Sequence, residues 1–557
     1  MVSDNTPHYG GTLVMAQLVW GYPGLEPGQD QGFDNSILSS QVYEPLAYGD
    51  WSRGPDGTGE FSFGPDSQSS NYNESSLAGI IADRWEISQD GLTLTVYLRH
   101  GVRFHNTAPA YGREVTAEDV KFCYERRLSK PQGYFLKIAS PDVKVRVVDR
   151  YIVAFDLKKF DYRILQDILT GSDSLIYPRE AVDPSTDKFL SNEVCGTGPY
   201  MLTDWVGGIS MTFDKNPFYY LHDELHSDFT LPYVDKLVCV WASSAATVAA
   251  LRTGKLDIDL QTLPKSSADS LRNTNPDIQI YPSHNQREGI YMHTDSGPLS
   301  DVRVRRALQI AIDGQALNRQ LGAENVTYTG FYSPEDGTAL YTPFNELPSS
   351  IKEQYTFDIK KAKELMANAG YPSGFSVELI DAAGQTSPLG IETAIANWAQ
   401  LGVKVNLSSN RNTSLEAMAQ KTREFFTKQG GNVMMTWWLS GGPNCTIIQS
   451  VMTGSLTTGN TATVSTYNYA FGDAEFGSRW NEIYRTVDLS ARFMLIKQAT
   501  LYAMENTFAV GLATIPSYVI AQSWVKGWHG EVGLRDGDYA SVVSRLWIDP
   551  EHLKPTQ

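Results

Sequence analysis

Strand-like runs alternate along this chain with helices whose ends are clearly marked. Residues 93–98 place leucine or valine at every second position, the pattern of a half-buried strand. Thr116 stands where a helix N-cap is expected and is followed by acids in the first turn, and Asp358 marks the start of a later helix. Because strands and helices interleave in this way, we expect lobes of the α/β class.

The chain has 557 residues, which is too long for one compact core, so we expect two or three lobes. Hydrophobic residues make up 41% of it, an ordinary share for a soluble globular protein. No unbroken apolar run reaches the length that spans a membrane. The formal net charge of -17 argues against nucleic acids and anionic membrane surfaces as the main partners.

The first residues, M-V-S-D-N-T-P at 1–7, are polar and lack the apolar core of a signal peptide. They are typical of a mature linker with an added initiator methionine, preceded by a signal or a lipid anchor. A cytoplasmic protein can begin in the same way, so the start alone leaves the compartment open.

The four cysteines contain no CxxC pair, which excludes a zinc ribbon and a disulfide-dense scaffold. Cys123 falls in a helical pattern and is expected in the core. Cys195 and Cys239 lie beside strand-like segments and either pair or stay free, because connectivity cannot be read from spacing. Cys445 is the fourth.

Motifs of catalysis and metal binding are missing from the sequence. His222 and His226 are four residues apart, but a zincin has glutamate directly after its first histidine, where Asp223 stands here. The segment lies between two prolines, so we expect a surface loop. There is no G-x-S-x-G elbow, and Gly254-Lys255 lacks the upstream glycine of a P-loop. We therefore predict no enzyme, no cofactor and no metal site.

The strongest ligand-binding pattern is an aromatic pair in front of a glycine-rich loop. Trp437 and Trp438 follow the apolar run 433–435 and precede S-G-G-P-N at 440–444. Indole rings give a large contact area at a low entropic cost, which suits a ligand platform. The alternative is that one ring belongs to the core, since alternation along a strand lets only one face a given side. The predicted ligand-binding residues are Trp437, Trp438, Ser440, Gly441, Trp20 and Tyr22.

A series of segments, in order, resembles the signature of the family 5 extracellular solute-binding proteins, the dipeptide, oligopeptide and nickel type. The longest is D-G-L-T-L-T-V-Y-L-R-H-G-V-R-F-H at 90–105, and the most compact is G-T-G-P-Y at 196–200. The other segments are 82–88, 115–122, 232–237, 251–257, 299–313 and A-G-Y-P-S-G-F at 369–375. Together they cover most of the chain.

The resemblance implies an α/β periplasmic-binding-protein fold of type II, with two lobes joined by hinge strands around a ligand cleft. It places lobe I in residues 1–46, 195–290 and the tail 522–557. An extra subdomain is expected at 47–194, and lobe II at 291–521.

By the same resemblance, the chain is the extracytoplasmic binding component of an ABC importer of the peptide class, and a monomer. It would capture a solute by hinge closure and deliver it to ABC permease subunits, in the periplasm or outside the cell. Peptide-binding relatives hold the ligand ammonium with an aspartate soon after a tryptophan, but 437–444 contains no carboxylate. An oligosaccharide or another non-peptide ligand, and peptides with altered anchoring, therefore remain alternatives. A secreted hydrolase is the remote one.

Overall fold

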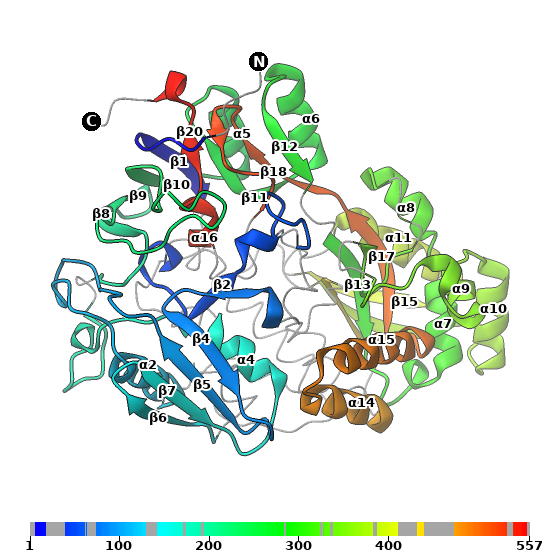
Figure 1. Cartoon of the computed structure of the whole chain (residues 1–557). Coiled ribbons are helices and arrows are strands. Elements are labelled where there is room, and N and C mark those ends of the chain that lie inside the picture. Colours follow the sequence, from blue (N-terminus) through cyan, green and yellow to red (C-terminus); the bar gives the residue numbers. More distant parts are fainter. Residues whose placement is uncertain are drawn as a thin grey trace. The chain divides into compact units, whose positions relative to one another are not determined.

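The computed structural model describes residues 6–17, 39–61, 63, 74–129, 142–170, 174–190, 194–282, 286–323, 326, 328–334, 338–381, 387–409, 432–438, 473–531 and 539–553. The chain forms two compact units (Figure 1). Unit 1 comprises residues 1–284 and 517–557, and unit 2 comprises residues 285–516. No helix within the described ranges is long and apolar enough to cross a membrane.

The main sheet of unit 1 has seven strands within the described residues. Their order is β12 (Gln279–Pro282), β18 (Ser517–Ala521), β11 (Ile258–Pro264), β1 (Thr12–Gln17), β10 (Lys236–Trp241), β9 (Ser210–Lys215) and β8 (Tyr200–Val206). Strand β1 is parallel to β10 and β11, and the outer pairs are antiparallel. Helices α5 (Ser244–Arg252) and α6 (Lys265–Thr274) bury Leu251 and Leu271 in a core shared with Ile520 of β18.

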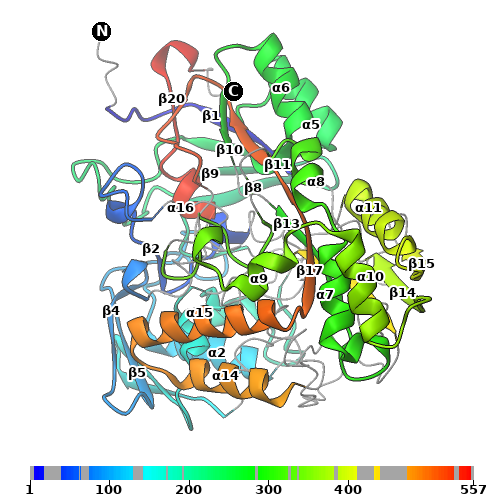
Figure 2. The same ribbon diagram turned by 90° about the vertical axis from the view of Figure 1, so that its right-hand side faces the viewer.

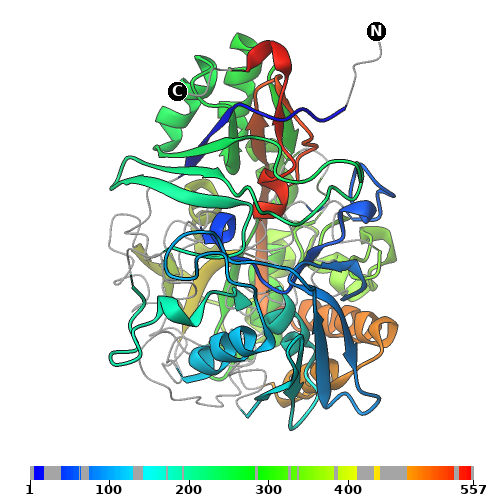
Figure 3. The same cartoon turned by 60° about the vertical axis from the view of Figure 1, so that its left-hand side comes forward.

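A second sheet of unit 1 has four described strands, in the order β4 (Ala82–Ile87), β5 (Thr93–Leu98), β7 (Ile152–Asp156) and β6 (Lys144–Asp149). The period-two pattern of β5 is confirmed, since its apolar residues are buried. Helix α2 (Ala117–Ser129) packs against β6 and β7 and starts directly after Thr116, as predicted (Figure 3). Helix α4 (Tyr162–Leu169) follows this sheet. Cys123 of α2 is buried, which confirms its predicted place in the core.

Smaller elements complete unit 1. Strands β2 (Ala47–Gly49) and β3 (Leu77–Gly79) form one pair, and β19 (Val525–Lys526) and β20 (Trp547–Ile548) form another. The C-terminal strand β20 contacts β1 at the opposite end of the chain (Figure 3). Helix α16 (Tyr539–Val543) precedes β20. Cys195 and Cys239 are separate, buried free thiols and form no disulfide with each other.

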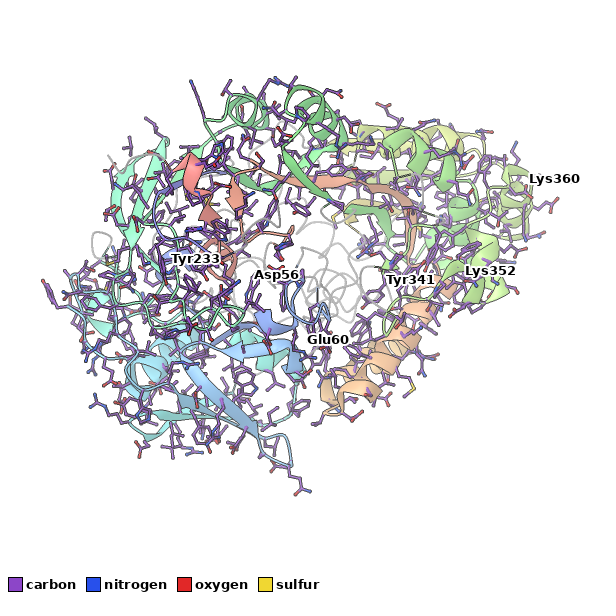
Figure 4. All side chains as sticks on the ribbon, turned by 45° about the horizontal axis from the view of Figure 1, so that its top comes forward. Asp56, Glu60, Tyr233, Tyr341, Lys352 and Lys360 are labelled. Carbon is purple, nitrogen blue, oxygen red and sulfur yellow. The ribbon has the colours of Figure 1, made fainter. Side chains whose placement is uncertain are left out.

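The segment with two histidines is a loop, as predicted. It contains a bridge between His222 and Thr230 and no helix. The carboxylate of Asp223 accepts hydrogen bonds from the Leu225 N–H and, at 2.6 Å, from the hydroxyl of Tyr233, labelled in Figure 4. Asp223 therefore ties the loop to the core of unit 1.

The G-T-G-P-Y motif brings two backbones into close contact in unit 1. A Cβ atom on Gly196 would lie 2.0 Å from the carbonyl oxygen of Val42, and one on Gly198 would lie 2.4 Å from that of Gln41. The Gly198 N–H donates to the Val42 carbonyl at 2.8 Å. Only glycine leaves room for this approach, which gives a physical reason for both glycines.

Two buried titratable groups flank the same motif. The carboxylate of Glu44 accepts hydrogen bonds from the hydroxyls of Thr197 (2.7 Å), Tyr219 (2.6 Å) and Tyr220 (2.9 Å). Burial still dominates and raises the pKa of Glu44 to about 7. The ring of His105 lies 3.0 Å from the Gly198 carbonyl through Nε2, and its Nδ1 accepts from the Gly196 N–H at 3.4 Å. Burial lowers the pKa of His105 to about 4.

Unit 2 is built on a sheet of five described strands. Their order is β15 (Lys404–Ser409), β14 (Ser376–Asp381), β16 (Val433–Trp438), β13 (Gln286–Met292) and β17 (Ala509–Ile515). Strand β14 is parallel to β15 and β16, and β13 is antiparallel to β16 and β17. Helices α7 (Val302–Ile310), α8 (Gly314–Leu321) and α11 (Pro388–Ala399) pack on this sheet (Figure 2). Helices α9 (Ser349–Gln354) and α10 (Ile359–Asn368) pack on α7, α15 (Leu489–Glu505) packs on α9, and α14 (Ala474–Arg485) packs on α15.

The local signals for the helices of unit 2 are confirmed. Asp358 caps α10 by accepting the Lys361 N–H at 2.9 Å. Gly370, after α10, and Gly402, before β15, have the positive φ angles of 90° and 80° that favour glycine. The apolar faces of α7, α10 and α11 share one core, with Trp398 fully buried in it.

Candidate ligand-binding site

In unit 2, the ends of three strands bring polar residues to one edge of the sheet. The parallel strands β14 and β16 end at Asp381 and Trp438, and the antiparallel strand β13 begins at the same edge. The register pairs Asp381 with Thr436, and Trp438 with Glu288. In open α/β sheets, ligands bind outside the carboxyl ends of the parallel strands. This edge is therefore the candidate site on unit 2.

The predicted aromatic pair ends the central strand at this edge. Trp437 and Trp438 are the last two residues of β16, and their backbones pair with Gly289 and Glu288. The side chains of both tryptophans lie outside the described part of the structure. Ser440, Gly441, Trp20 and Tyr22 also lie outside the described residues. Their roles therefore remain predictions.

Glu288 fastens the start of α11 to the sheet. Its carboxylate accepts hydrogen bonds from the backbone N–H of Ser387 and, at 3.1 Å, from the Ser387 hydroxyl. Ser387 itself caps α11 by accepting the Gly390 N–H at 3.0 Å. A carboxylate at a helix N-terminus is stabilised by the helix dipole. Glu288 is fully buried, so we assign it a structural role at the rim of the site.

Asp381 is the buried acid at the end of β14. Its exposed fraction is 0%, and the hydroxyl of Thr436 on the neighbouring strand lies 3.4 Å from its Oδ1. Five residues of uninterrupted strand precede it, so its position is set by the sheet and not by a loop. A carboxylate in this place has the chemistry to bind an ammonium group of a ligand.

Arg287 carries the opposite charge at the same edge. It is buried, pairs in register with Thr514 of β17, and acts electrostatically on the hydroxyl of Tyr328. Burial raises the pKa of Tyr328 above its usual range, and the charge of Arg287 opposes that rise. A guanidinium presents a planar fork of donors that matches a carboxylate.

Aromatic side chains surround Tyr328. Its ring centroid lies 6.0 Å from that of Tyr341 in a stacked arrangement, 5.8 Å from Phe344 and 5.2 Å from Tyr355. The Tyr328 hydroxyl donates to the Thr342 carbonyl at 2.6 Å. Figure 4 labels Tyr341 in this aromatic cluster. These rings hold Tyr328, the residue on which the charge of Arg287 acts, in a rigid apolar cluster.

The sequence prediction did not include Asp381 or Arg287. Each is a charged residue at one end of a mostly apolar segment that also contains a glutamate, V-E-L-I-D at 377–381 and R-E-G-I-Y-M at 287–292. Charged residues often end strands, so this signal is weak without the register of the sheet. Among the described residues, no group of histidine, cysteine, aspartate and glutamate side chains is arranged to hold a metal ion.

The model of the family described as "Bacterial extracellular solute-binding proteins, family 5 Middle" matches residues 77–457. The chain belongs to this family. Proteins of this family bind peptides and related solutes for ABC import, so this solute-binding protein has the function class that its motifs predicted. Members are periplasmic or extracellular and deliver their ligands to ABC permeases.

Similar curated proteins differ in the solutes after which they are named. The chain is 27% identical over 480 residues to heme-binding protein A of Haemophilus influenzae, covering 80% of this chain and 81% of that protein. It is 25% identical to di/tripeptide-binding protein 3 of Pseudomonas aeruginosa, covering 59% of this chain and 63% of that one. It is 27% identical to the glutathione-binding protein of Salmonella typhimurium, covering 63% and 66%. The chain thus spans slightly less than two thirds of the last two relatives.

Solved structures share the fold of this solute-binding protein. The periplasmic binding protein DppA from Helicobacter pylori, in complex with the peptide STSA, superposes with a TM-score of 0.70 at 20% identity, covering 97% of this chain and 99% of that one. HbpA2 from Haemophilus parasuis gives a TM-score of 0.73 at 22% identity, covering 96% and 99%. The predicted fold of type II periplasmic binding proteins is thereby confirmed. The similar proteins are solute-binding proteins and not enzymes.

Proposed function

We propose that this solute-binding protein captures a short peptide or a peptide-like solute that carries both charges. The observation that carries the proposal is that Asp381 and Arg287, buried and oppositely charged, stand beside the end of β16 at one sheet edge, where strand alternation places them on opposite faces. A zwitterionic ligand offers an ammonium for the first and a carboxylate for the second. Because residues 437–444 contain no carboxylate, Asp381 at the end of β14 would bind the ammonium in their place.

The charges favour a peptide over the other ligands. An oligosaccharide is neutral and offers neither an ammonium nor a carboxylate to these two residues, whereas haem presents two carboxylates and no ammonium. The similar proteins are named for the binding of heme, di/tripeptides and glutathione, so all three ligand classes belong in one test.

A thermal-shift screen tests the proposal. Haemin, glutathione, the dipeptide Met-Leu, the tetrapeptide Ser-Thr-Ser-Ala and a set of glycans are each added to the purified protein. A ligand present at a hundred times its Kd stabilises the native state by about 2.7 kcal/mol, which raises the Tm measurably. We expect a rise with glutathione or the peptides. A rise with glycans or haemin alone contradicts the peptide proposal, and turnover of any ligand would support the hydrolase alternative.

Removing the carboxylate charge of Asp381 should weaken binding strongly. We expect Asp381→Asn to lower the affinity for the best peptide by about tenfold to a hundredfold, because a buried ammonium then lacks its counter-charge. Isothermal titration calorimetry measures the change. Glu378→Gln, on the same strand but only partly buried, is the matched control and should bind normally. Equal affinities for both variants would show that Asp381 does not touch the ligand.

Truncating the second tryptophan tests the proposed stacking platform. We expect Trp438→Ala to weaken ligand binding by about tenfold while the variant stays folded, because stacking on an indole contributes roughly 1–3 kcal/mol. Calorimetry gives the affinity, and circular dichroism checks the fold. Unchanged affinity in the folded variant would count against the platform.

We also propose that capture works by hinge closure between the predicted lobes, and that the protein acts as a monomer. Closure requires that the ligand bind the closed form more tightly than the open form. Small-angle scattering with and without a ligand from the screen measures the closure, and light scattering after size exclusion measures the mass. Fractionation of cells that produce the protein from its own gene tests the expected lipid anchor, by showing whether the protein is recovered with the membranes.

A further inference from the structure

In unit 1, the histidine His529 lies beside two carboxylates, those of Asp56 and Glu531. None of these three residues is among the predicted ligand-binding residues. The Nδ1 of His529 lies 3.0 Å from Oδ2 of Asp56 and 3.7 Å from Oε1 of Glu531. The backbone N–H of His529 also donates to Oε2 of Glu531 at 2.6 Å. Glu531 is almost fully buried, whereas Asp56 and His529 are each more than a third exposed. Protons therefore reach the cluster easily.

Asp56 belongs to a compact segment, 50–61, which is folded on itself. The 3-10 helix η1 (Trp51–Arg53) is capped by Asp50, and backbone hydrogen bonds close the turns that follow. Arg53 pairs with Glu60, and its guanidinium lies 4.8 Å from the ring of Phe61. The contact between Asp56 and His529 joins this segment to residues 528–531. Figure 4 labels Asp56 and Glu60 on it.

Residues 528–531 in turn pack on the strand that leads out of unit 1. The rings of Trp528 and Tyr281 meet edge to face at 4.8 Å, and the Tyr281 hydroxyl lies 3.4 Å from the Trp528 carbonyl. Gly530 has a φ of +99°, and a Cβ atom there would lie 2.9 Å from the Cβ of Tyr281. The Trp528 indole N–H donates to the Glu531 carbonyl at 2.8 Å, which closes this turn.

Tyr281 lies on β12, which pairs with β18. These two strands border the two places where the chain passes between the units, since β12 ends at Pro282 and β18 begins at Ser517. Hinge motions are absorbed by a few residues at the ends of such elements. The packing of residues 528–531 on Tyr281 therefore affects the first of the two connections between the units, the one that follows β12.

The charges that the described residues place around His529 have one sign. Among the described residues, the groups that shift its pKa through charge are Asp56 and Glu531, and Tyr281 is the other titratable side chain packed on this turn. The hydrogen bond with Asp56 raises the pKa of His529, and burial raises the pKa of Glu531. The folded state thus holds protons here more tightly than the unfolded chain does. This stabilisation is fully present below the ordinary imidazole pKa of 6.5 and is lost as the pH rises through the raised one.

We propose that Asp56, His529 and Glu531 form a proton-operated latch. When His529 is protonated, the latch holds segment 50–61 against residues 528–531 and orders Tyr281 on β12. This order tightens ligand binding. With the imidazole neutral, no described residue places a cation between the two carboxylates, and the latch loosens. An ordered connection loses less conformational entropy when the ligand closes the protein, so the affinity rises as the pH falls from about 8 to about 6. The latch is separate from the proposed ligand site, and it adds regulation by pH to it.

Hydrogen exchange of the ligand-free protein tests the latch without any ligand. In the wild type we expect exchange in peptides covering 50–61 and 279–282, corrected for the intrinsic rate, to be about fivefold slower at low than at high pH, a typical size for a coupling. His529→Gln should remove this difference. Asp56→Asn, which changes only a partly exposed acid, should do the same if His529→Gln fails to fold. His552→Gln, an exposed histidine of unit 1 stacked on Trp524, is the matched control and should keep it.

Calorimetry with glutathione and with Met-Leu at both pH values tests the link to ligand binding. We expect about fivefold tighter binding at low pH in the wild type and in His552→Gln, but not in His529→Gln. Equal exchange at both pH values in the wild type, or a difference that survives in His529→Gln, would overturn the latch. A pH effect on exchange without one on affinity would overturn its effect on the ligand. If neither probe binds, the proposed function fails while the exchange data still decide on the latch.

Discussion

We expect Gly196→Ala to lower the free energy of unfolding by about 3 kcal/mol or more, because the new methyl group would overlap a backbone atom. The Cβ atom would lie 2.0 Å from the carbonyl oxygen of Val42 and 2.8 Å from the ring of Tyr43. A backbone atom cannot move aside as the end of a flexible side chain can. The same close approach includes two hydrogen bonds, from the Gly198 N–H to the Val42 carbonyl and from the Thr197 hydroxyl to Glu44. A backbone shift that removed the overlap would disturb both.

Gly207→Ala is the matched control for this substitution. Gly207 lies in the turn between β8 and β9, and no atom would come within 4 Å of a Cβ placed there. We expect its stability to stay within about 1 kcal/mol of the wild type. Urea unfolding followed by circular dichroism measures both variants. If Gly196→Ala is as stable as Gly207→Ala, the backbone around Val42 can shift enough to accommodate a methyl group. The close approach would then not require glycine at position 196.

The features of the fold that could be predicted from sequence residues alone are the local ones. The cap at Asp358 and the alternation in 93–98 are local, because a cap and a strand period depend on neighbours within a few residues. The sheet order is not local. Strand β18 lies between β12 and β11, a pairing of residues more than two hundred positions apart, and no local pattern in the sequence predicts it.

The candidate site was predictable only in part. The aromatic pair at 437–438 stands out in the sequence because two tryptophans precede a glycine-rich loop. Asp381 and Arg287 do not stand out, since each is a charged residue at one end of a mostly apolar segment that also contains a glutamate. Only the parallel pairing of β14 with β16, and the antiparallel pairing of β13 with β16, bring them to the same edge.

Two buried groups beside Gly196 and Gly198 should respond to pH in opposite directions. Glu44 has a pKa of about 7 in the folded protein, raised from 4.5 chiefly by burial, with Arg99 as a nearby positive charge. His105 has a pKa of about 4, lowered from 6.5 by burial, with its hydrogen bond to Gly198 opposing the shift. The folded state binds a proton on Glu44 more tightly than the unfolded chain does, and binds one on His105 more weakly.

The sign of each effect follows from linkage. The contribution of Glu44 is fully present below pH 4.5 and is lost as the pH rises through about 7. The contribution of His105 is present above pH 6.5 and is lost as the pH falls through about 4. Each shift corresponds to about 3 kcal/mol, and the two slopes cancel over most of the shared range. The wild type therefore conceals both effects.

Single substitutions should reveal both effects. Relative to the wild type, Glu44→Gln should gain about 3 kcal/mol of unfolding free energy as the pH rises from 4.5 to 7, because the cost of ionising a buried acid is removed. His105→Gln should gain a similar amount relative to the wild type as the pH falls from 6.5 to 4. Urea unfolding at closely spaced pH values measures both curves, and each variant serves as the control for the other. Burial raises the pKa of an acid and lowers that of a base, so the unfolding free energies of the two variants, each relative to the wild type, should change with pH in opposite directions. Changes in the same direction for both variants would contradict this prediction.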